Sequence, residues 1–341
     1  MLFRTNGFTG LMSMKDGGNE NVDTGSHLAI GVTLAGLAYL DPVVAQNPGL
    51  AQAVMIGTLI GSNAPDFDAV LRLKGFSCYI RYHRGITHSI PALFIWPAFI
   101  SLLLSLAYNS LNWWPHLYIW SFIAIVLHVF LDLLNVYGVQ CMRPFNEKWF
   151  HLDILSIFEP LLFLVHASGL VLWLILGHDP AQVFSWVYAL SFVYIGLRAW
   201  YHYLLLRRVK RFLNVKGIYH VLPDLLGYKW SFVVETDHCF YTGKIVFHQI
   251  TLEDQYTKEK NNEVVQATMG IDGVRAFLGF AQRIHVTWSE LKDGYEVIWS
   301  DVRFWYNHKL PFGVVVRLNR DLEVVDYNLG WRKKAWSPPF V

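Results

Sequence analysis

The chain has 341 residues, of which 54% are apolar and 16% are charged, and its formal net charge at pH 7 is +2. Soluble domains average roughly 25% charged residues, so the composition excludes an ordinary soluble enzyme and indicates a membrane protein. The small net charge, with no concentrated basic face, also argues against nucleic acid as a partner. Three cysteines, far apart and without a CxxC pair, predict neither a disulfide framework nor a cysteine-built zinc site.

The first 22 residues are polar and rich in Gly and Asn. They lack the apolar core of a signal peptide, so we expect a disordered extension over residues 1–22. One hypothesis places the natural start of translation at Met12, Met14 or Val22.

Six hydrophobic segments follow and predict an α-helical integral membrane domain over residues 23–211. They cover residues 27–40, 50–64, 89–109, 116–136, 157–177 and 183–206. No Asp, Glu, Lys or Arg lies between Arg84 and Asp132, so this stretch can hold a pair of roughly 20-residue spans. The first two segments are shorter, and a re-entrant hairpin or a buried helix competes there with a true span.

Positive charges alternate along the connections between these segments. They occur before the first segment, in the second and fourth connections and after the sixth segment, at Arg4, Lys15, Arg72, Lys74, Arg81, Arg84, Arg143, Lys148, Arg207, Arg208, Lys210 and Arg211. The first, third and fifth connections have none. Because Lys and Arg accumulate in cytoplasmic loops, we expect a multi-pass protein of the plasma or inner membrane with both termini in the cytoplasm.

The last third of the chain has a different pattern. From about Lys216 charges return every few residues, and alternation such as YEVIWSDVRFWY is typical of strands. Hairpin signals occur at residues 292–294 (KDG) and 319–321 (NRD). These patterns predict a soluble, cytoplasmic, β-rich domain over residues 212–341, built as a small antiparallel sheet or sandwich.

Seven His and Asp residues occur in four short motifs, GSH, PDFD, HRGITHS and HVFLD. They are His27, Asp66, Asp68, His83, His88, His128 and Asp132. The predicted topology gathers all seven at the cytoplasmic membrane face, also if the first two segments form a re-entrant hairpin. His128 and Asp132 are spaced i and i+4, so they project from one face of a helix, a spacing that lets two side chains share a metal ion.

These residue types indicate metal binding, because an aspartate beside an apolar helix is costly unless it is paired. Imidazole and carboxylate ligands suit a divalent ion, with Zn²⁺ favoured and Mn²⁺ or Fe²⁺ as alternatives. Seven ligands exceed one tetrahedral ion, so the sequence is compatible with one ion or with two bridged ions about 3.5 to 4 Å apart. In an extended or turn segment after Pro65, one of Asp66 and Asp68 would bridge while the other ligates or orients a histidine.

The motifs GSH, PDFD, HRGITHS and HVFLD, followed by NVYGVQCMRPF, resemble the YdjM-like family of LexA-regulated inner-membrane proteins over about residues 23–160. The chain is still more similar to the YfhP-like branch of that family. The resemblance implies a membrane-bound, metal-dependent hydrolase. Family members tend to carry Asp-Pro where this chain has Glu159-Pro160.

The expected function is hydrolysis of a phosphoester or carboxylic ester, with a lipid among the candidate substrates and membrane lipids as partners. Metal-activated water would attack, Asp66 or Asp68 would act as general base, and Arg84, with Arg143 as a further candidate, would neutralise developing negative charge. Thr87 and Ser89 flank His88 as hydrogen-bond donors to it or to substrate. The alternative is a metal-ion transporter, or a sensor or regulatory membrane protein, that uses the same ligands without hydrolysis, although no repeat between the halves of the chain supports transport.

The other histidines are interpreted as ordinary interfacial or hydrogen-bonded residues. They are His116, His166, His178, His202 and His220. His151 and Asp153 are weaker candidates for the metal site than the seven residues above. The oligomeric state is left open by the sequence.

Overall fold

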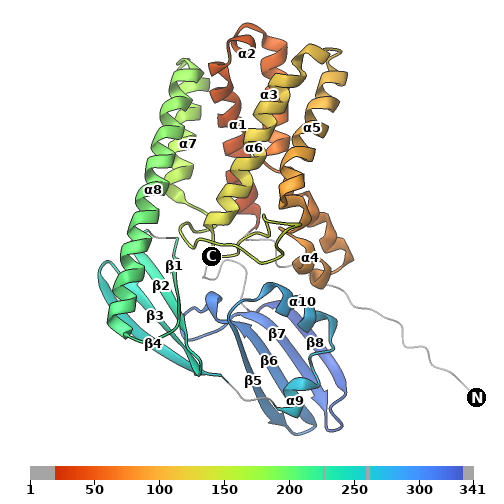
Figure 1. Cartoon of the computed structure of the whole chain (residues 1–341), viewed down its shortest axis with the longest axis vertical. Helices are drawn as coiled ribbons and strands as arrows, with labels where there is room; N and C mark the ends of the chain where they lie inside the picture. The colour runs from red at the N-terminus through yellow and green to blue at the C-terminus, as the bar shows by residue number, and fades with distance from the viewer. Residues whose placement is uncertain (1–19, 226, 259–261, 333–341) are drawn as a thin grey trace, which may run out of the picture.

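The computed structural model describes residues 20–225, 227–258 and 262–332. A bundle of helices occupies one end of the molecule, and two β-sheets occupy the other (Figure 1). Most of the predicted disordered extension, residues 1–19, lies outside the described residues, and helix α1 begins at Glu20.

The helical part follows the six hydrophobic segments. Its helices are α1 (Glu20–Leu37), α2 (Pro42–Gln46), α3 (Pro48–Gly61), α4 (Phe76–Tyr82), α5 (Ile90–Ala107), α6 (Trp114–Leu134), α7 (Pro160–Leu174) and α8 (Pro180–Leu213). Within the described residues, three stretches are long and apolar enough to cross a membrane, namely Ile90–Ala107, Leu111–Leu134 and Pro180–Leu213. The apolar helices Gly25–Leu40, Pro48–Gly61 and Pro160–Leu174 are shorter, so three of the six expected spans have full length.

Helices α3 and α6 approach each other closely because small residues line their contact. A Cβ atom added at Gly57 would lie 2.9 Å from Ser121 Oγ, and one at Gly61 would lie 3.1 Å from the Cβ of Ala124. Glycines one turn apart allow such close packing between apolar helices. The contact brings the C-terminal end of α3, at Ser62, next to α6.

The connection between α3 and α5 corrects one expectation from the sequence. The PDFD motif, expected in an extended or turn segment, lies in a 3₁₀ helix, η2 (Ala64–Lys74), with Pro65 in its first turn. Helix α4 and a second 3₁₀ turn, η3 (Ile86–His88), follow before α5 begins. Proline fits the first turn of a helix, where its missing N–H costs nothing. This compact connection folds back under the helical bundle.

The C-terminal part consists of two antiparallel four-stranded sheets, as the alternating pattern predicts. The first has the order β1-β2-β3-β4, with β1 (Ile218–Pro223), β2 (Lys229–Glu235), β3 (Cys239–Val246) and β4 (Gln249–Thr257). The second has the order β5-β6-β7-β8, with β5 (Ile284–Leu291), β6 (Gly294–Asp301), β7 (Phe312–Asn319) and β8 (Val324–Trp331). Helices α9 (Glu263–Gln266) and α10 (Asp272–Phe280) join them. Both predicted hairpins are confirmed, between β5 and β6 and between β7 and β8.

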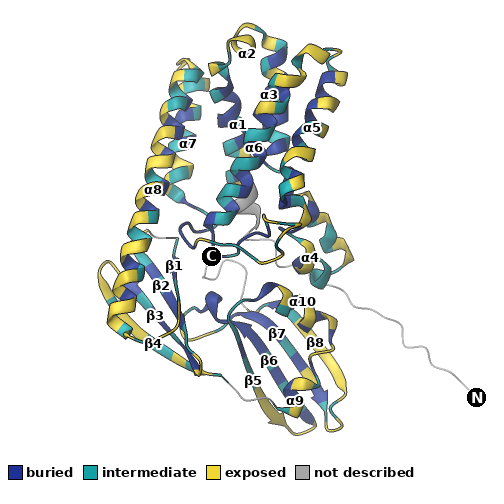
Figure 2. Ribbon diagram, viewed as in Figure 1, coloured by how far each residue is buried: buried dark blue, intermediate teal, exposed yellow. Residues whose placement is uncertain are grey.

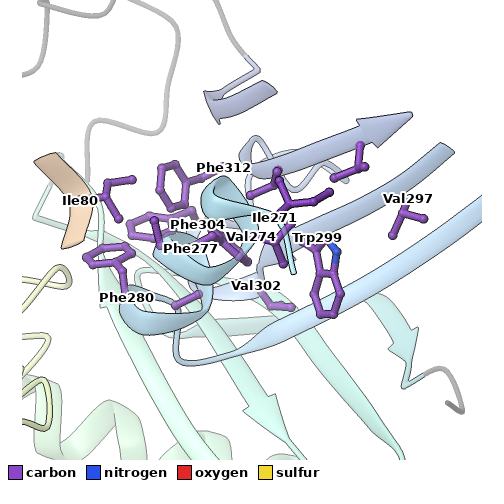
Figure 3. Packing of buried hydrophobic residues seen from close by; sticks show 14 of the residues in the cluster. Ile80, Ile271, Val274, Phe277, Phe280, Val297, Trp299, Val302, Phe304 and Phe312 are labelled. Carbon is purple, nitrogen blue, oxygen red and sulfur yellow. The ribbon is translucent and has the colours of Figure 1, made fainter. Parts of the chain in front are cut away.

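Each sheet packs against a different part of the helical bundle. Leu205 and Val209, near the end of α8, share a core with the first sheet. The second sheet and α10 form a core that also includes Ile80 of α4 and Val136 from the segment after α6 (Figure 3). Figure 2 shows buried residues on the facing sides of the helices and along strands β6 and β7.

A buried ion pair reinforces the contact with the second sheet. The guanidinium of Arg303, which is 1% exposed, contacts Asp301 at 2.6 Å and donates a hydrogen bond of 3.1 Å to the carbonyl of Val136. The second sheet is therefore fixed to α4 and to the segment that follows α6. These two segments flank the residues of the candidate site.

Candidate metal centre

The candidate centre begins on the last turns of α6. His128 and Asp132 are each 1% exposed, and His128 Nε2 lies 3.5 Å from Asp132 Oδ2. The expected i, i+4 geometry is therefore present. Both side chains are almost completely buried.

Two residues from the α3–α5 connection complete the group. His88 Nε2 lies 3.2 Å from Asp132 Oδ2 and 3.4 Å from Asp66 Oδ1, and Asp66 Oδ1 lies 3.6 Å from His128 Nε2. All four ligand atoms fall within 4.8 Å of one another. They are buried, and none has a well-formed hydrogen-bond partner among the described residues.

This arrangement fits a divalent cation. Ligand atoms about 2.0 to 2.1 Å from a tetrahedral zinc ion would lie roughly 3.3 Å apart, close to the observed separations of 3.2 to 3.6 Å. Two nitrogens and two carboxylate oxygens without a thiolate are a donor set for Zn²⁺, Mn²⁺ or Fe²⁺. An ion here would also satisfy four buried atoms that are otherwise left without hydrogen bonds.

The other ring nitrogens orient the two imidazoles. His128 Nδ1 donates a hydrogen bond of 2.7 Å to the carbonyl of Ser62. His88 Nδ1 lies 2.9 Å from Thr87 Oγ1, whose hydroxyl donates to Asp68 Oδ2 at 2.6 Å. Because Nδ1 carries the proton in both rings, the Nε2 lone pairs face the centre, as in metal sites whose histidines are held by outer hydrogen bonds.

Arg84 compensates the charge of Asp132 on the side away from the histidines. Its guanidinium lies 3.0 Å from Asp132 Oδ1 and donates a hydrogen bond of 3.1 Å to Asn135 Oδ1. The backbone at Arg84 has a positive φ of 58°. A Cβ at Gly85 would lie 2.8 Å from the carbonyl of Tyr82, which explains the glycine in HRG. Arg84, the expected anion clamp, therefore binds Asp132 and Asn135 of the protein itself.

Asp68 and His83 form a pair beside the four-residue group. Asp68 Oδ1 lies 2.6 Å from His83 Nδ1, while Oδ2 accepts hydrogen bonds from Thr87 Oγ1 and from the backbone N–H of Arg84. In a 3₁₀ helix residues two apart point in different directions, so Asp66 reaches the centre and Asp68 does not. Together with Asp66, this pair forms a second group of compatible ligand atoms.

His27 reaches the centre from α1 but contributes no atom to the four-residue group. Its ring is 3% exposed and packs against the ring of His128 with a centroid distance of 4.1 Å. The structure therefore brings all seven predicted residues together. It divides them into four convergent side chains that could hold a metal ion, one hydrogen-bonded Asp–His pair and one histidine packed against His128.

The electrostatics of the centre favour a cation. Burial by itself raises the pKa of Asp66, but the imidazoles of His128 and His88 lower that pKa well below its usual range. Burial lowers the pKa of His88, and its contacts with Asp132 and Asp66 raise it above the ordinary value. Ionised carboxylates therefore attract positive charge to the space between the four side chains. A metal ion and a proton on Nε2 of His88 would compete for this space.

Two contributors were not found from the sequence. The carbonyl of Ser62 acts through the backbone, for which residue type gives no signal. Asn135 accepts from Arg84 and from the backbone N–H groups of Tyr137 and Gly138. Asn135 lies three residues after Asp132, a spacing that places two side chains on the same helix face. This spacing is the feature of the sequence that indicates a contact between the two residues.

A third polar group lies farther along the chain, between the helices and the first sheet. Asp153 contacts His151 Nδ1 at 2.7 Å and His220 Nδ1 at 3.0 Å. The remaining ring nitrogens are also engaged, His151 Nε2 by Gln282 and His220 Nε2 by the guanidinium of Arg283. These hydrogen bonds connect the helical part with the C-terminal part of the chain, and the ligand atoms of His151, Asp153 and His220 are also close enough together to hold a metal ion.

The remaining predicted residues have other partners. Arg143 lies 3.5 Å from Glu147, and Ser89 Oγ donates to the carbonyl of Ile86. His116 pairs with Asp41 at the far end of the bundle. Glu159 contacts Arg198 at 3.3 Å.

Apolar helices of spanning length and a buried cluster of His and Asp side chains define a membrane protein with a candidate metal centre. Residues 22–205 match the model of the YdjM inner membrane protein family, and residues 263–336 match the YfhP C-terminal alpha/beta plait domain. The chain belongs to the YdjM inner membrane protein family.

One curated relative matches along nearly the whole chain. The protein called "Uncharacterized protein YfhP" from Bacillus subtilis (strain 168) is 36% identical over 318 residues, which cover 91% of this chain and 95% of that protein. No solved structure matches the chain.

Substituting the proposed ligands tests the centre. We expect His88→Ala and Asp132→Ala to lose the bound metal, because each leaves three ligands and an uncompensated buried charge. His116→Ala, on the opposite end of the bundle, is the control and should retain it. Elemental analysis of the purified full-length proteins gives the stoichiometry. Full metal content in both ligand variants would contradict this assignment.

Substituting Thr87 tests the outer hydrogen bonds. Thr87→Val removes the hydroxyl between Asp68 and His88 while keeping the side-chain volume, so His88 loses its orienting partner. We expect metal affinity to fall by about 10- to 100-fold, measured by competition with a chelator of known affinity. Thr33→Val, in a different polar cluster, should leave the affinity unchanged. An unchanged affinity in Thr87→Val would mean that the hydroxyl does not support the ligand.

Proposed function

We propose that this protein is a membrane-bound hydrolase whose four-residue centre binds one divalent cation, preferentially Zn²⁺. The observation that carries the proposal is the convergence of four buried ligand atoms from Asp66, His88, His128 and Asp132. Three separate segments supply them, so the fold itself assembles the group. Because four side chains would already hold such a cation, a water molecule would have to join as an additional ligand, and the cation would then act as a Lewis acid and lower the pKa of that water.

The exposure of the ligands suggests the side from which water and substrate arrive. The side chain of Asp66 is 26% exposed, whereas those of His88, His128 and Asp132 are exposed by 1% or less. The histidines and Asp132 are therefore suited to holding the ion from the protein side. Asp66 would lie on the side of the ion that water and substrate reach.

His83 is the proposed proton acceptor. Its Nδ1 is engaged by Asp68 at 2.6 Å, so the Nε2 lone pair is available, and its side chain is 18% exposed. Its ring centroid lies 6.2 Å from that of His88. His83 Nε2 would take a proton from the attacking water and return it to the leaving alkoxide, while Asp68 holds the imidazole in the correct tautomer.

Arg84 is proposed to position Asp132 and to stabilise its charge. The substrate class is a phosphoester or a carboxylic ester, because either one accumulates negative charge on an oxygen that a cation neutralises. The alternation of Lys and Arg supports a location of the centre at the cytoplasmic membrane face. Transport has less support, because the ligands gather near the end of α6 and not at the middle of the bundle.

The proposal is tested by separating metal binding from proton transfer. Metal-loaded protein in detergent is assayed with p-nitrophenyl esters, p-nitrophenyl phosphates and phospholipids. We expect turnover of at least one class, and a drop of about 10²- to 10⁴-fold in kcat for His83→Gln with unchanged metal content. His88→Ala should lose both metal and turnover.

Two results would contradict it. Absence of turnover with every substrate in the fully metal-loaded protein would reject a hydrolase. Full activity of His83→Gln would reject its role as proton acceptor and return that role to Asp66.

A further inference from the structure

A pocket opens beside the candidate centre, between α1, the end of α6 and the start of α7. It encloses about 60 Å³. Its polar end is lined by His27 and Asp132, so it adjoins the four-residue group directly. Most of its walls are apolar and include Ile30, Leu131, Leu155, Ile157, Leu162 and Phe163, while Ser26, Asn135 and Ser156 add polar lining.

The far end of the pocket carries no available polar group. His166 closes it, and both ring nitrogens of His166 are engaged, Nδ1 by Thr33 Oγ1 at 2.8 Å and Nε2 by Ser191 Oγ at 3.2 Å. This polar contact is internal to the bundle. It leaves the inner part of the pocket suited to an apolar ligand group.

The one carboxylate at the side of the pocket is compensated. Glu159 Oε1 contacts Arg198 at 3.3 Å and accepts from the backbone N–H of Ser156, and Oε2 accepts from the hydroxyl of Tyr194. A ligand in the pocket would therefore meet uncompensated charge mainly at the end beside the candidate centre. The pocket is polar at one end and apolar along its length.

The dimensions favour a thin chain. Glu159, the residue before α7, and His166 are seven residues apart, which corresponds to about 10 Å along the helix. The enclosed volume of about 60 Å³, against roughly 150 Å³ for a cavity that accepts a benzene ring, holds only about two methylene-sized groups, so the rest of a chain would lie along the open side of the pocket. Phe163, one of the lining residues, is 40% exposed, so the pocket borders the outside of the apolar helices.

We propose that this pocket binds the alkyl chain of the substrate, which is a single-chain amphiphile that enters from the membrane. Its ester or phosphoester group would lie at the centre and its unbranched chain between α1 and α7. Water would cleave the ester bond to give an alcohol and a carboxylate or phosphate. The inference rests on the proposed hydrolase function for the reaction, but the binding of the chain is measurable without turnover.

The test uses an octyl phosphonate that carries a photoreactive diazirine at the end of its chain and cannot be hydrolysed. Metal-loaded full-length protein is labelled in detergent, and the modified peptides are mapped by mass spectrometry. We expect labels on α1 and α7 near Ile30 and His166, displaced by octyl phosphate but not by inorganic phosphate. Displacement by inorganic phosphate alone would mean that only the headgroup is recognised and would overturn the proposal.

Matched variants on α7 locate the chain. Leu162→Trp fills the pocket and should reduce labelling by at least tenfold, whereas Leu164→Trp, on an exposed face of the same helix, should leave it unchanged. Ile30→Trp fills the pocket from α1 and repeats the test if Leu162→Trp fails to fold. Metal content serves as the folding control. Labelling spread over α5 and α8, and insensitive to both pocket variants, would overturn the proposal.

The two proposals fail separately. Specific labelling of the pocket without turnover of any ester would reject the hydrolase and support the chain site. Turnover that is equal for short and long chains, together with unspecific labelling, would reject the chain site and support the hydrolase.

Discussion

Asp132 is a carboxylate at 1% exposure near the end of a long apolar helix, and much of the surrounding structure compensates its charge. Arg84 contacts one of its oxygens at 3.0 Å, and His88 and His128 approach the other at 3.2 and 3.5 Å. Placing such a charge away from water costs several kcal/mol unless it is paired. Arg84 supplies one part of the compensation, and a divalent cation between the imidazoles and carboxylates would supply the rest.

The fold holds this arrangement through contacts at some distance from it. Glycines in α3 bring Ser62 to the ring of His128, and the 3₁₀ turn at PDFD separates the directions of Asp66 and Asp68. On the other side, Arg303 ties the second sheet to the carbonyl of Val136, four residues after Asp132. The β-rich part therefore packs against the segments that carry or follow the site residues. The C-terminal part therefore supports the position of the segments beside the candidate centre.

Much of the site follows from the sequence because its signals are local. The helical spacing of His128 and Asp132 and the scarcity of other ionisable residues in the apolar stretches point to residues that the structure brings together in the candidate centre. The division of roles does not follow, because it depends on backbone geometry. PDFD has the composition of a turn, yet it lies in a 3₁₀ helix that begins at Ala64. The contacts of Arg84 with Asp132 and Asn135 join separate segments of the chain, which the sequence alone does not show. Length alone also does not decide how many apolar helices cross a membrane.

The most direct measurement of the central claim is X-ray absorption spectroscopy at the edge of the metal that copurifies with the full-length protein. The account predicts imidazole nitrogen and carboxylate oxygen ligands at about 2.0 to 2.2 Å, with no sulfur, for a zinc ion. In His88→Ala the metal signal should disappear. A spectrum with sulfur ligands, or one that is identical in the wild-type protein and in His88→Ala, would contradict the claim that these four side chains form a metal centre.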